Sequence, residues 1–144
     1  MSPSPSERAT AMAPGNPRGH VLVVERDLQV RELQRFFLER AAFRVHFADD
    51  GIAALEQARD APPVLVITEI LVPRLDGLTL CRRLRDDPLT RDVPIVVFSI
   101  LSAAARAADA GASTFLRKPL VESTFLAAVR DAIAVQSTGI LEPQ

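Results

Sequence analysis

The chain has little of several residue types, and each shortage argues against a class of protein. Tryptophan and tyrosine are absent, and Cys81 is the only cysteine among 144 residues. A single cysteine cannot form an internal disulfide, so we expect a reducing, cytoplasmic environment. No apolar run reaches the ~18 residues that a membrane span needs, and the first twenty residues lack the apolar core of a secretory signal. Membrane insertion and export are therefore not expected.

An excess of charge of one sign is also missing. The chain has 17 basic and 18 acidic residues, for a formal net charge of -1. Binding to nucleic acid normally needs a basic patch or stripe, and binding to a membrane surface needs an excess of cations. We therefore expect neither nucleic acid nor a membrane as a partner.

The remaining composition is typical of one domain with a tail at each end. A chain of this length can bury one continuous core. Residues 1–18 hold four prolines among serine, alanine and charged residues, and they offer no periodic apolar face, so we expect a disordered tail. The ordered domain is predicted over 19–135, and 136–144 is predicted to be a frayed C-terminal tail.

Strand-like and helix-like segments alternate five times in the predicted domain. The apolar runs at 21–24, 64–67 and 94–98 are typical of strands covered on both faces, whereas 43–47 alternates like an edge strand and 114–116 is a short fifth strand. Amphipathic or alanine-rich helices follow each strand, the last two over 102–109 and 122–135. Asp27 is predicted to cap the first helix, and Gly111 to end the fourth. This order predicts a doubly wound α/β sandwich with a parallel sheet.

Polar residues follow four of the predicted strands. In doubly wound folds, sites form at the carboxyl ends of the strands, so these residues should converge. They are Glu25 and Arg26 after the first strand, Glu69 after the third, Ser99 after the fourth and Lys118 after the fifth.

These residues and their surroundings resemble the response-regulator receiver domains of two-component signalling. The resemblance is carried by VLVVERD at 21–27, the E-x-x-x-P-x-x-D-G frame at 69–77, CRRLRDDPLTRDVP at 81–94, PIVVFS at 94–99 and GASTFLRKP at 111–119. It implies a flavodoxin-like sheet of five strands in the order 2-1-3-4-5, flanked by five helices. It also implies a cis bond between Lys118 and Pro119.

The family's chemistry needs residues that this chain has partly replaced. In that family two acids after the first strand and an aspartate after the third hold Mg²⁺, and the aspartate accepts a phosphoryl group from a histidine kinase. A hydroxyl after the fourth strand and a lysine after the fifth contact the phosphoryl oxygens, and an aromatic residue on the fifth strand responds. Carried over to this chain, the two acids correspond to Glu25 and Arg26, and the acceptor aspartate to Glu69. The hydroxyl corresponds to Ser99, the lysine to Lys118 and the aromatic residue to Phe115.

Two of these replacements predict that the phosphoryl chemistry is lost. Glu25 and Glu69 against Arg26 and Lys118 give no net charge for a cation to balance, so we expect Arg26 to take the place of Mg²⁺. The additional methylene of Glu69 displaces its carboxylate by about 1.5 Å, and a near-attack geometry tolerates little such error. Thr68, on the other side of the strand, is only a weak substitute acceptor.

Two interpretations of Glu69 stay open at this point. Its carboxylate can mimic an aspartyl phosphate by reaching Lys118 and Ser99, or it can pair with Arg26 and freeze the site. Phe115 is expected to point inward, and Ile100 to shield the pocket. The segment 99–111 is about one helical turn shorter than is usual for the family, so the fourth helix is expected to be altered. His20 and His46 are expected to be surface residues.

The sequence thus predicts a stand-alone, atypical receiver that is not an enzyme. It is expected to bind a signalling protein partner, a histidine kinase or a downstream effector, independently of phosphorylation, and the resemblance allows a homodimer. The alternative is a receiver that still accepts phosphate through an altered acceptor or cation. A small-ligand or flavin pocket ranks last, because the loop after the first strand lacks the Ser/Thr/Gly residues that cradle a phosphate.

Overall fold

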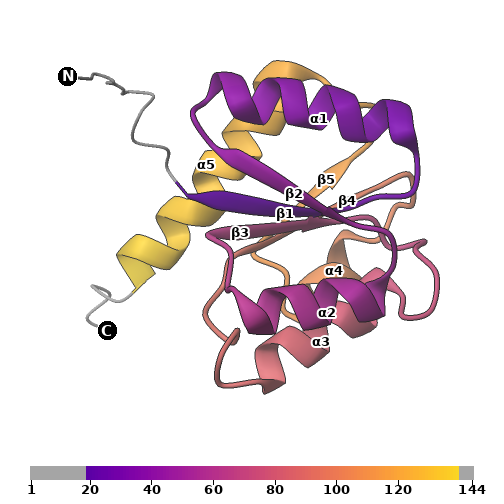
Figure 1. Ribbon diagram of the computed structural model, residues 1–144, viewed down its shortest axis with the longest axis vertical. Helices are drawn as coiled ribbons and strands as arrows, with labels where there is room; N and C mark the ends of the chain where they lie inside the picture. The colour runs from indigo at the N-terminus through magenta and orange to yellow at the C-terminus, as the bar shows by residue number, and fades with distance from the viewer. Residues whose placement is uncertain (1–18, 140–144) are drawn as a thin grey trace.

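The computed structural model describes residues 19–139 as a parallel sheet of five strands with helices on both faces (Figure 1). The strands lie in the order β2-β1-β3-β4-β5, as the resemblance implied. The strands are β1 (His20–Val24), β2 (Arg44–Ala48), β3 (Leu65–Thr68), β4 (Ile95–Ser99) and β5 (Thr114–Arg117). The helices are α1 (Leu28–Arg40), α2 (Gly51–Asp60), α3 (Gly77–Asp86), α4 (Ala104–Ala110) and α5 (Glu122–Gly139). The predicted tail at 1–18 and the last five residues lie outside the described residues.

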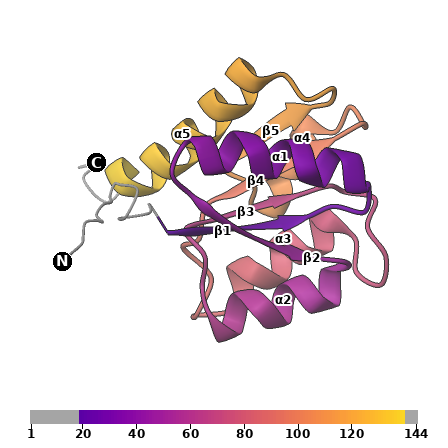
Figure 2. The same ribbon diagram turned by 45° about the horizontal axis from the view of Figure 1, so that its top comes forward.

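The sheet is covered by α1 and α5 on one face and by α2, α3 and α4 on the other (Figures 1 and 2). Side chains of β1 alternate between the two layers: Val21 and Val23 pack toward α1 and α5, whereas Leu22 and Val24 pack toward α2 and α3. The inner strands are therefore apolar on both sides. β2 is an edge strand and keeps an exposed His46, as its alternation predicted.

The ends of the helices follow the capping signals in the sequence. The carboxylate of Asp27 accepts hydrogen bonds from the backbone N–H groups of Gln29 and Val30, and Gly111 ends α4 in the left-handed conformation with φ of 105°. Two boundaries differ from the prediction. α4 begins at Ala104, where no side chain caps it, and α5 continues to Gly139.

The single cysteine and the apolar content of the helices can now be described. Cys81 is buried as a small core residue, and burial raises the pKa of its thiol to about 12. Within 19–139, no helix is long and apolar enough to cross a membrane.

Candidate functional site

Four polar side chains meet at the carboxyl end of the sheet. Glu25 follows β1, Glu69 follows β3, Ser99 ends β4 and Lys118 follows β5. Glu25 and Glu69 are only 3% and 5% exposed, and Ser99 is fully buried. We call these four residues the buried charge cluster. The sequence predicted that they converge, and the structure brings them together as expected.

Lys118 lies between the two carboxylates. Its Nζ atom is 2.9 Å from Oε1 of Glu25 and 3.1 Å from Oε1 of Glu69. The bond from Lys118 to Pro119 is cis, and the Lys118 backbone N–H donates to the carbonyl of Ser99 at 2.9 Å. Burial alone would lower the pKa of Lys118, but hydrogen bonds to both glutamates and their charges outweigh burial and raise it above its ordinary value of 10.5. Lys118 is therefore charged and paired.

The carboxylate of Glu69 is surrounded by hydrogen-bond donors. Oε2 accepts from the Ser99 hydroxyl and from the backbone N–H groups of Ile70 at 2.6 Å and Leu71 at 3.3 Å. Oε1 accepts from Lys118 and from the N–H of Ile100 at 3.4 Å. Burial would raise the pKa of Glu69, but the hydrogen bonds from Ser99, Lys118 and Leu71, with the Lys118 charge, hold it below its ordinary value of 4.5. Glu69 is therefore an anion whose oxygens are already occupied.

Arg26 does not take part in this cluster, so the expectation that it takes the place of the metal ion is wrong, and so is the open interpretation that pairs it with Glu69. Its side chain is exposed, and within 19–139 it forms no hydrogen bond or ion pair. Glu25 is buried directly after β1, whereas the next residue, Arg26, lies in a bend of the loop to α1 and is exposed. The charge count changes accordingly: two carboxylates and one ammonium leave the cluster with -1 rather than zero.

The cluster does not fit the Mg²⁺ ion that the family implies. Mg²⁺ needs near-octahedral oxygen ligands at about 2.0–2.1 Å. Here an ammonium group lies between the two carboxylates, and Oε2 of Glu25 accepts from the Asp27 N–H at 3.1 Å. Asp27 itself caps α1, and the described part of the chain holds no group of three His, Cys, Asp or Glu residues arranged for a metal.

Three other residues singled out in the sequence lie around the cluster. Phe115 is half-buried and packs against the core beside α4. Thr68 is fully buried and donates to the carbonyl of Glu69 at 2.9 Å, so its hydroxyl is not free. The Ile100 side chain is exposed, and its contact with Glu69 is made by its backbone N–H. That the Ile100 side chain shields the pocket stays a prediction.

Sequence reasoning missed a contact between two histidines. The rings of His20 and His46 lie 4.6 Å apart between centroids, because β1 and β2 pair in parallel with Leu22 opposite His46. Burial, together with the nearby His46, lowers the pKa of His20 below 6.5. The strand pairing was the signal that could have revealed this contact, since residue spacing along the chain does not.

Known proteins with similar sequences point to one family. Residues 21–130 match the family model described as response regulator receiver domain. The chain is 40% identical over 114 residues to the response regulator MprA of Mycobacterium leprae, covering 76% of this chain and 49% of the relative. It is 38% identical over 117 residues to the transcriptional regulatory protein CseB of Streptomyces avermitilis, covering 77% of this chain and 47% of the relative. The chain thus spans about half the length of these relatives.

Solved structures agree on the fold. A sensor protein from Polaromonas sp. JS666 superposes with a TM-score of 0.75 at 30% identity, covering 83% of this chain and 99% of that one. The signal receiver domain of a signal transduction histidine kinase from Syntrophus aciditrophicus superposes with a TM-score of 0.74 at 28% identity, covering 81% of this chain and 90% of that one.

Proposed function

Because the chain belongs to the response regulator receiver domain family, we propose that it acts in two-component signalling by binding a protein partner without being phosphorylated. The partner is a histidine kinase or a downstream effector. Glu69 stands at the position of the phosphoacceptor aspartate, and Arg26 at that of a metal-binding acid. In this proposal the domain is a binding module and not an enzyme.

The contact of Glu69 with Ser99 and Lys118 carries the proposal. In the family the corresponding hydroxyl and lysine contact the oxygens of the phosphoryl group. Here both groups already bind the Glu69 carboxylate. Of the two interpretations left open by the sequence, this geometry favours a built-in mimic of the phosphorylated state over pairing with Arg26. The exposed position of Arg26 points the same way.

The same geometry argues against phosphoryl transfer to Glu69. The attacking oxygen must reach the donor in an aligned, near-attack position, yet the Glu69 residue is only 5% exposed and both carboxylate oxygens accept hydrogen bonds. Phosphoryl transfer also depends on a metal ion to neutralise developing charge. The ligands for that ion do not fit, so Mg²⁺ binding is expected to be lost.

An exposed apolar surface on α1 supports the binding role. Leu28, Leu33 and Phe36 are exposed on this helix, and we call them the α1 patch. A cleft of about 330 Å³ borders the patch and reaches Lys118, with Leu33 and Leu120 among its walls. Clustered apolar side chains on a surface mark interaction sites more often than isolated ones do. A protein bound to the α1 patch would lie beside the buried charge cluster.

Exposure to a small phosphodonor tests the central point. The chain is incubated with acetyl phosphate and Mg²⁺, and its intact mass is measured. We expect no mass increase, whereas the Arg26→Asp, Glu69→Asp double variant, which regains the family's acids, should gain one phosphate. Beryllofluoride with Mg²⁺ should likewise perturb the spectrum of the double variant only.

The alternative makes the opposite prediction for the unmodified chain. A receiver that uses an altered acceptor or cation would gain a phosphate in the presence of Mg²⁺ and lose it when the metal is chelated. A phosphorylated peptide that contains Glu69 or Thr68 would therefore refute the proposal.

A further inference from the structure

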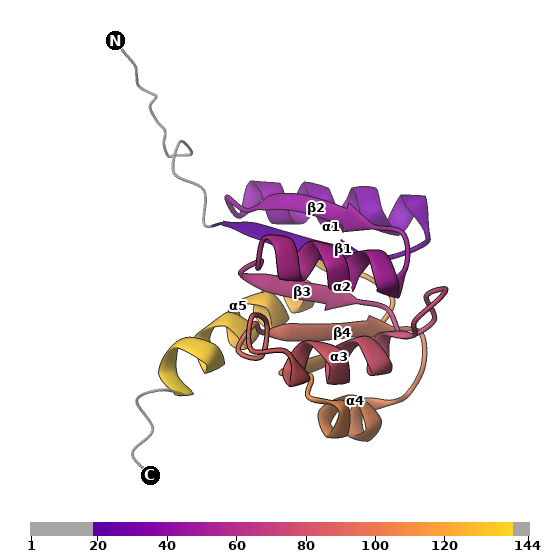
Figure 3. The ribbon, with the colours of Figure 1, turned by 60° about the horizontal axis from the view of Figure 1, so that its bottom comes forward.

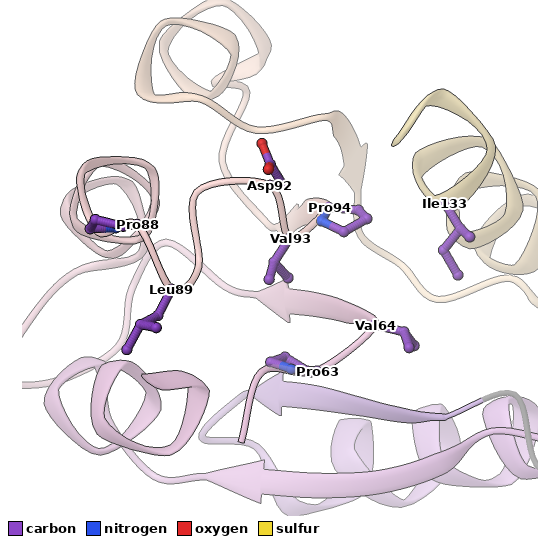
Figure 4. Close-up of a pocket in the computed structure, with 8 residues that line it drawn as sticks. All are labelled: Pro63, Val64, Pro88, Leu89, Asp92, Val93, Pro94 and Ile133. Carbon is purple, nitrogen blue, oxygen red and sulfur yellow. The ribbon is translucent and has the colours of Figure 1, made fainter. Parts of the chain in front are cut away.

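Two hollows lie where the strands begin, at the opposite end of the sheet from the buried charge cluster. The larger has a volume of about 320 Å³ and lies at the start of β3 and β4 (Figure 4). Its walls are mainly apolar, and its acidic residue, Asp92, already interacts with the Arg85 guanidinium. The smaller hollow, of about 190 Å³, is lined by His20, His46 and Asp60. The smaller hollow is therefore the one that gathers side chains able to bind an ion.

The two imidazoles of this hollow come from neighbouring parallel strands. His46 of β2 pairs with Leu22 of β1, and His20 lies two residues before Leu22. Because side chains two residues apart on a strand share a face, all three lie on the same face of the sheet. It is the face covered by α2, since Leu22 packs into that core layer. We call His20 and His46 the histidine pair.

The distance within the histidine pair suits two ligands of a single ion. An imidazole nitrogen binds a transition-metal ion at about 2.0–2.1 Å, so two imidazoles in adjacent coordination positions have ring centroids about 4.5–5.2 Å apart. The observed separation of 4.6 Å lies in this range. His46 is exposed, so its ring can turn toward an ion without displacing core residues.

The end of α2 adds favourable electrostatics beside the histidine pair. Figure 3 shows that α2 finishes on the side of the molecule where β1 begins. Asp60, the last residue of α2, and the C-cap residue Ala61 line the hollow together with both rings. The carboxylate and the negative end of the helix dipole both favour a cation.

The Ala61 backbone also orients one of the rings. Its carbonyl accepts a hydrogen bond from the His20 imidazole. A carbonyl that accepts from one ring nitrogen fixes the tautomer and leaves the other nitrogen as a metal ligand. One nearby cation works against binding: Arg44 is opposite His20 in the strand pairing, and it is exposed.

We propose that the histidine pair binds one divalent transition-metal ion, with His20 and His46 as ligands and water in the remaining positions. Imidazole nitrogen suits zinc, nickel and copper, and the affinity of a given site is highest for Cu²⁺. The residues that the structure describes include no group of three metal ligands, so this site would be open to a further ligand. A bound ion would tie the edge strand β2 to β1.

Electron paramagnetic resonance of the full chain with Cu²⁺ tests the proposal. The chain contains two histidines in all, so pulsed spectra can count the imidazoles on the ion directly. We expect one strongly bound Cu²⁺ per chain, with two imidazole nitrogens. His46→Gln should leave one imidazole and weaken binding roughly a hundredfold, because the second ligand is no longer held close to the ion. Arg44→Gln, the same replacement two residues away on β2, keeps both rings and should bind at least as tightly as the unmodified chain.

A mixing experiment separates a site within one chain from an ion that bridges two copies. Equal amounts of the His20→Gln and His46→Gln variants should give spectra with one imidazole, both alone and together. Two imidazoles in any of these samples would mean that the ion bridges two copies. That result, one imidazole in the unmodified chain, or unchanged affinity in His46→Gln would overturn the proposal. The imidazole count in the unmodified chain needs no variant, so it decides the question even if a substitution disturbs folding.

Discussion

Lys118 is the single cation that separates two buried carboxylates, and the cluster depends on it. Lys118→Met would leave Glu25 and Glu69 buried without their counterion. Removing one partner of a buried ion pair costs about 3–5 kcal/mol. We expect a loss of that order in the free energy of unfolding, measured by urea denaturation at neutral pH.

Arg26→Met is the matched control, because it removes a cation predicted from the sequence to serve the same cluster. Its side chain is exposed and unpaired within the described residues, so the free energy should change by less than about 0.5 kcal/mol. Equal losses in the two variants would show that Arg26, and not Lys118 alone, balances the carboxylates.

Ionisation of Glu69 should shape the acid side of the stability curve. Its pKa in the folded chain lies below 4.5, so its contribution is fully present above about pH 4.5 and is lost as the pH falls through the folded pKa. Glu69→Gln should lower the free energy of unfolding at neutral pH by about 1–3 kcal/mol. Its urea midpoint should depend less on pH below 4.5, and the two curves should converge in acid.

Glu56→Gln serves as the control for this pH dependence. Glu56 is exposed on α2, so losing its charge should leave the acid side of the curve unchanged. If Glu69→Gln followed the unmodified chain at every pH, the ionised carboxylate would not contribute to folding.

Residue-scale reasoning identified the cluster but mistook one of its members. The sequence showed which strands end in Glu25, Glu69, Ser99 and Lys118, and parallel topology then brought these residues together. Arg26 was added because it follows Glu25. Its exposed position depends on the bend of the loop between β1 and α1, which no residue pattern specifies. Hydrogen bonds such as those of Ile70 and Ile100 to Glu69 depend on loop paths that no residue pattern specifies.

At the scale of elements, the start of α3 packs closely against the loop that carries Glu69, and Gly77 is the residue at the contact. A Cβ atom added to Gly77 would fall on the carbonyl oxygen of Glu69 and lie 2.9 Å from the Cα of Ile70. In an unobstructed helix, replacing glycine by alanine stabilises by up to about 1 kcal/mol. Here we expect Gly77→Ala to destabilise the chain by about 1–3 kcal/mol in urea denaturation, because the backbone must move.

Arg82→Ala provides the comparison on the same helix. Arg82 is exposed on α3, and its replacement should change the free energy of unfolding by less than about 0.5 kcal/mol. A stabilising Gly77→Ala would mean that the loop can yield to the new methyl group at little cost.

Element boundaries were predictable where a side chain sets them. Asp27 sets the start of α1 by accepting hydrogen bonds from its first N–H groups, and Gly111 ends α4 with a positive φ. Both can be predicted from the sequence, because aspartate and glycine are the residue types that favour these positions. The start of α4 has no such residue, and the prediction was early by two positions. Arg85 on α3 donates to the carbonyls of Gly111 and Val93. The sequence could not predict these hydrogen bonds, because they depend on how α3, the loop after it and the end of α4 lie relative to one another.

At the scale of the whole molecule, the carboxyl end of the sheet combines a buried anion with an apolar surface beside it. The Glu69 carboxylate is fully hydrogen-bonded, and Leu28, Leu33 and Phe36 are exposed on the neighbouring α1. A receiver whose pocket is closed has to act through surfaces of this kind. Leu33 is 41% exposed, because Gln34 and Leu38 are the residues of α1 that are buried.

Phe36→Asp tests whether the α1 patch binds the partner. Phe36 is 53% exposed, and its ring lies 5.4 Å from the Arg40 guanidinium, outside the core. The substitution should therefore leave the fold intact, while loss of a central aromatic anchor costs about 2 kcal/mol of binding energy, or about thirtyfold in Kd. Titration calorimetry with the isolated partner measures this change. Ala105→Asp, which adds the same single negative charge at an exposed position of α4, should bind as the unmodified chain does, and weakening in both variants would mean that net charge rather than the patch governs binding.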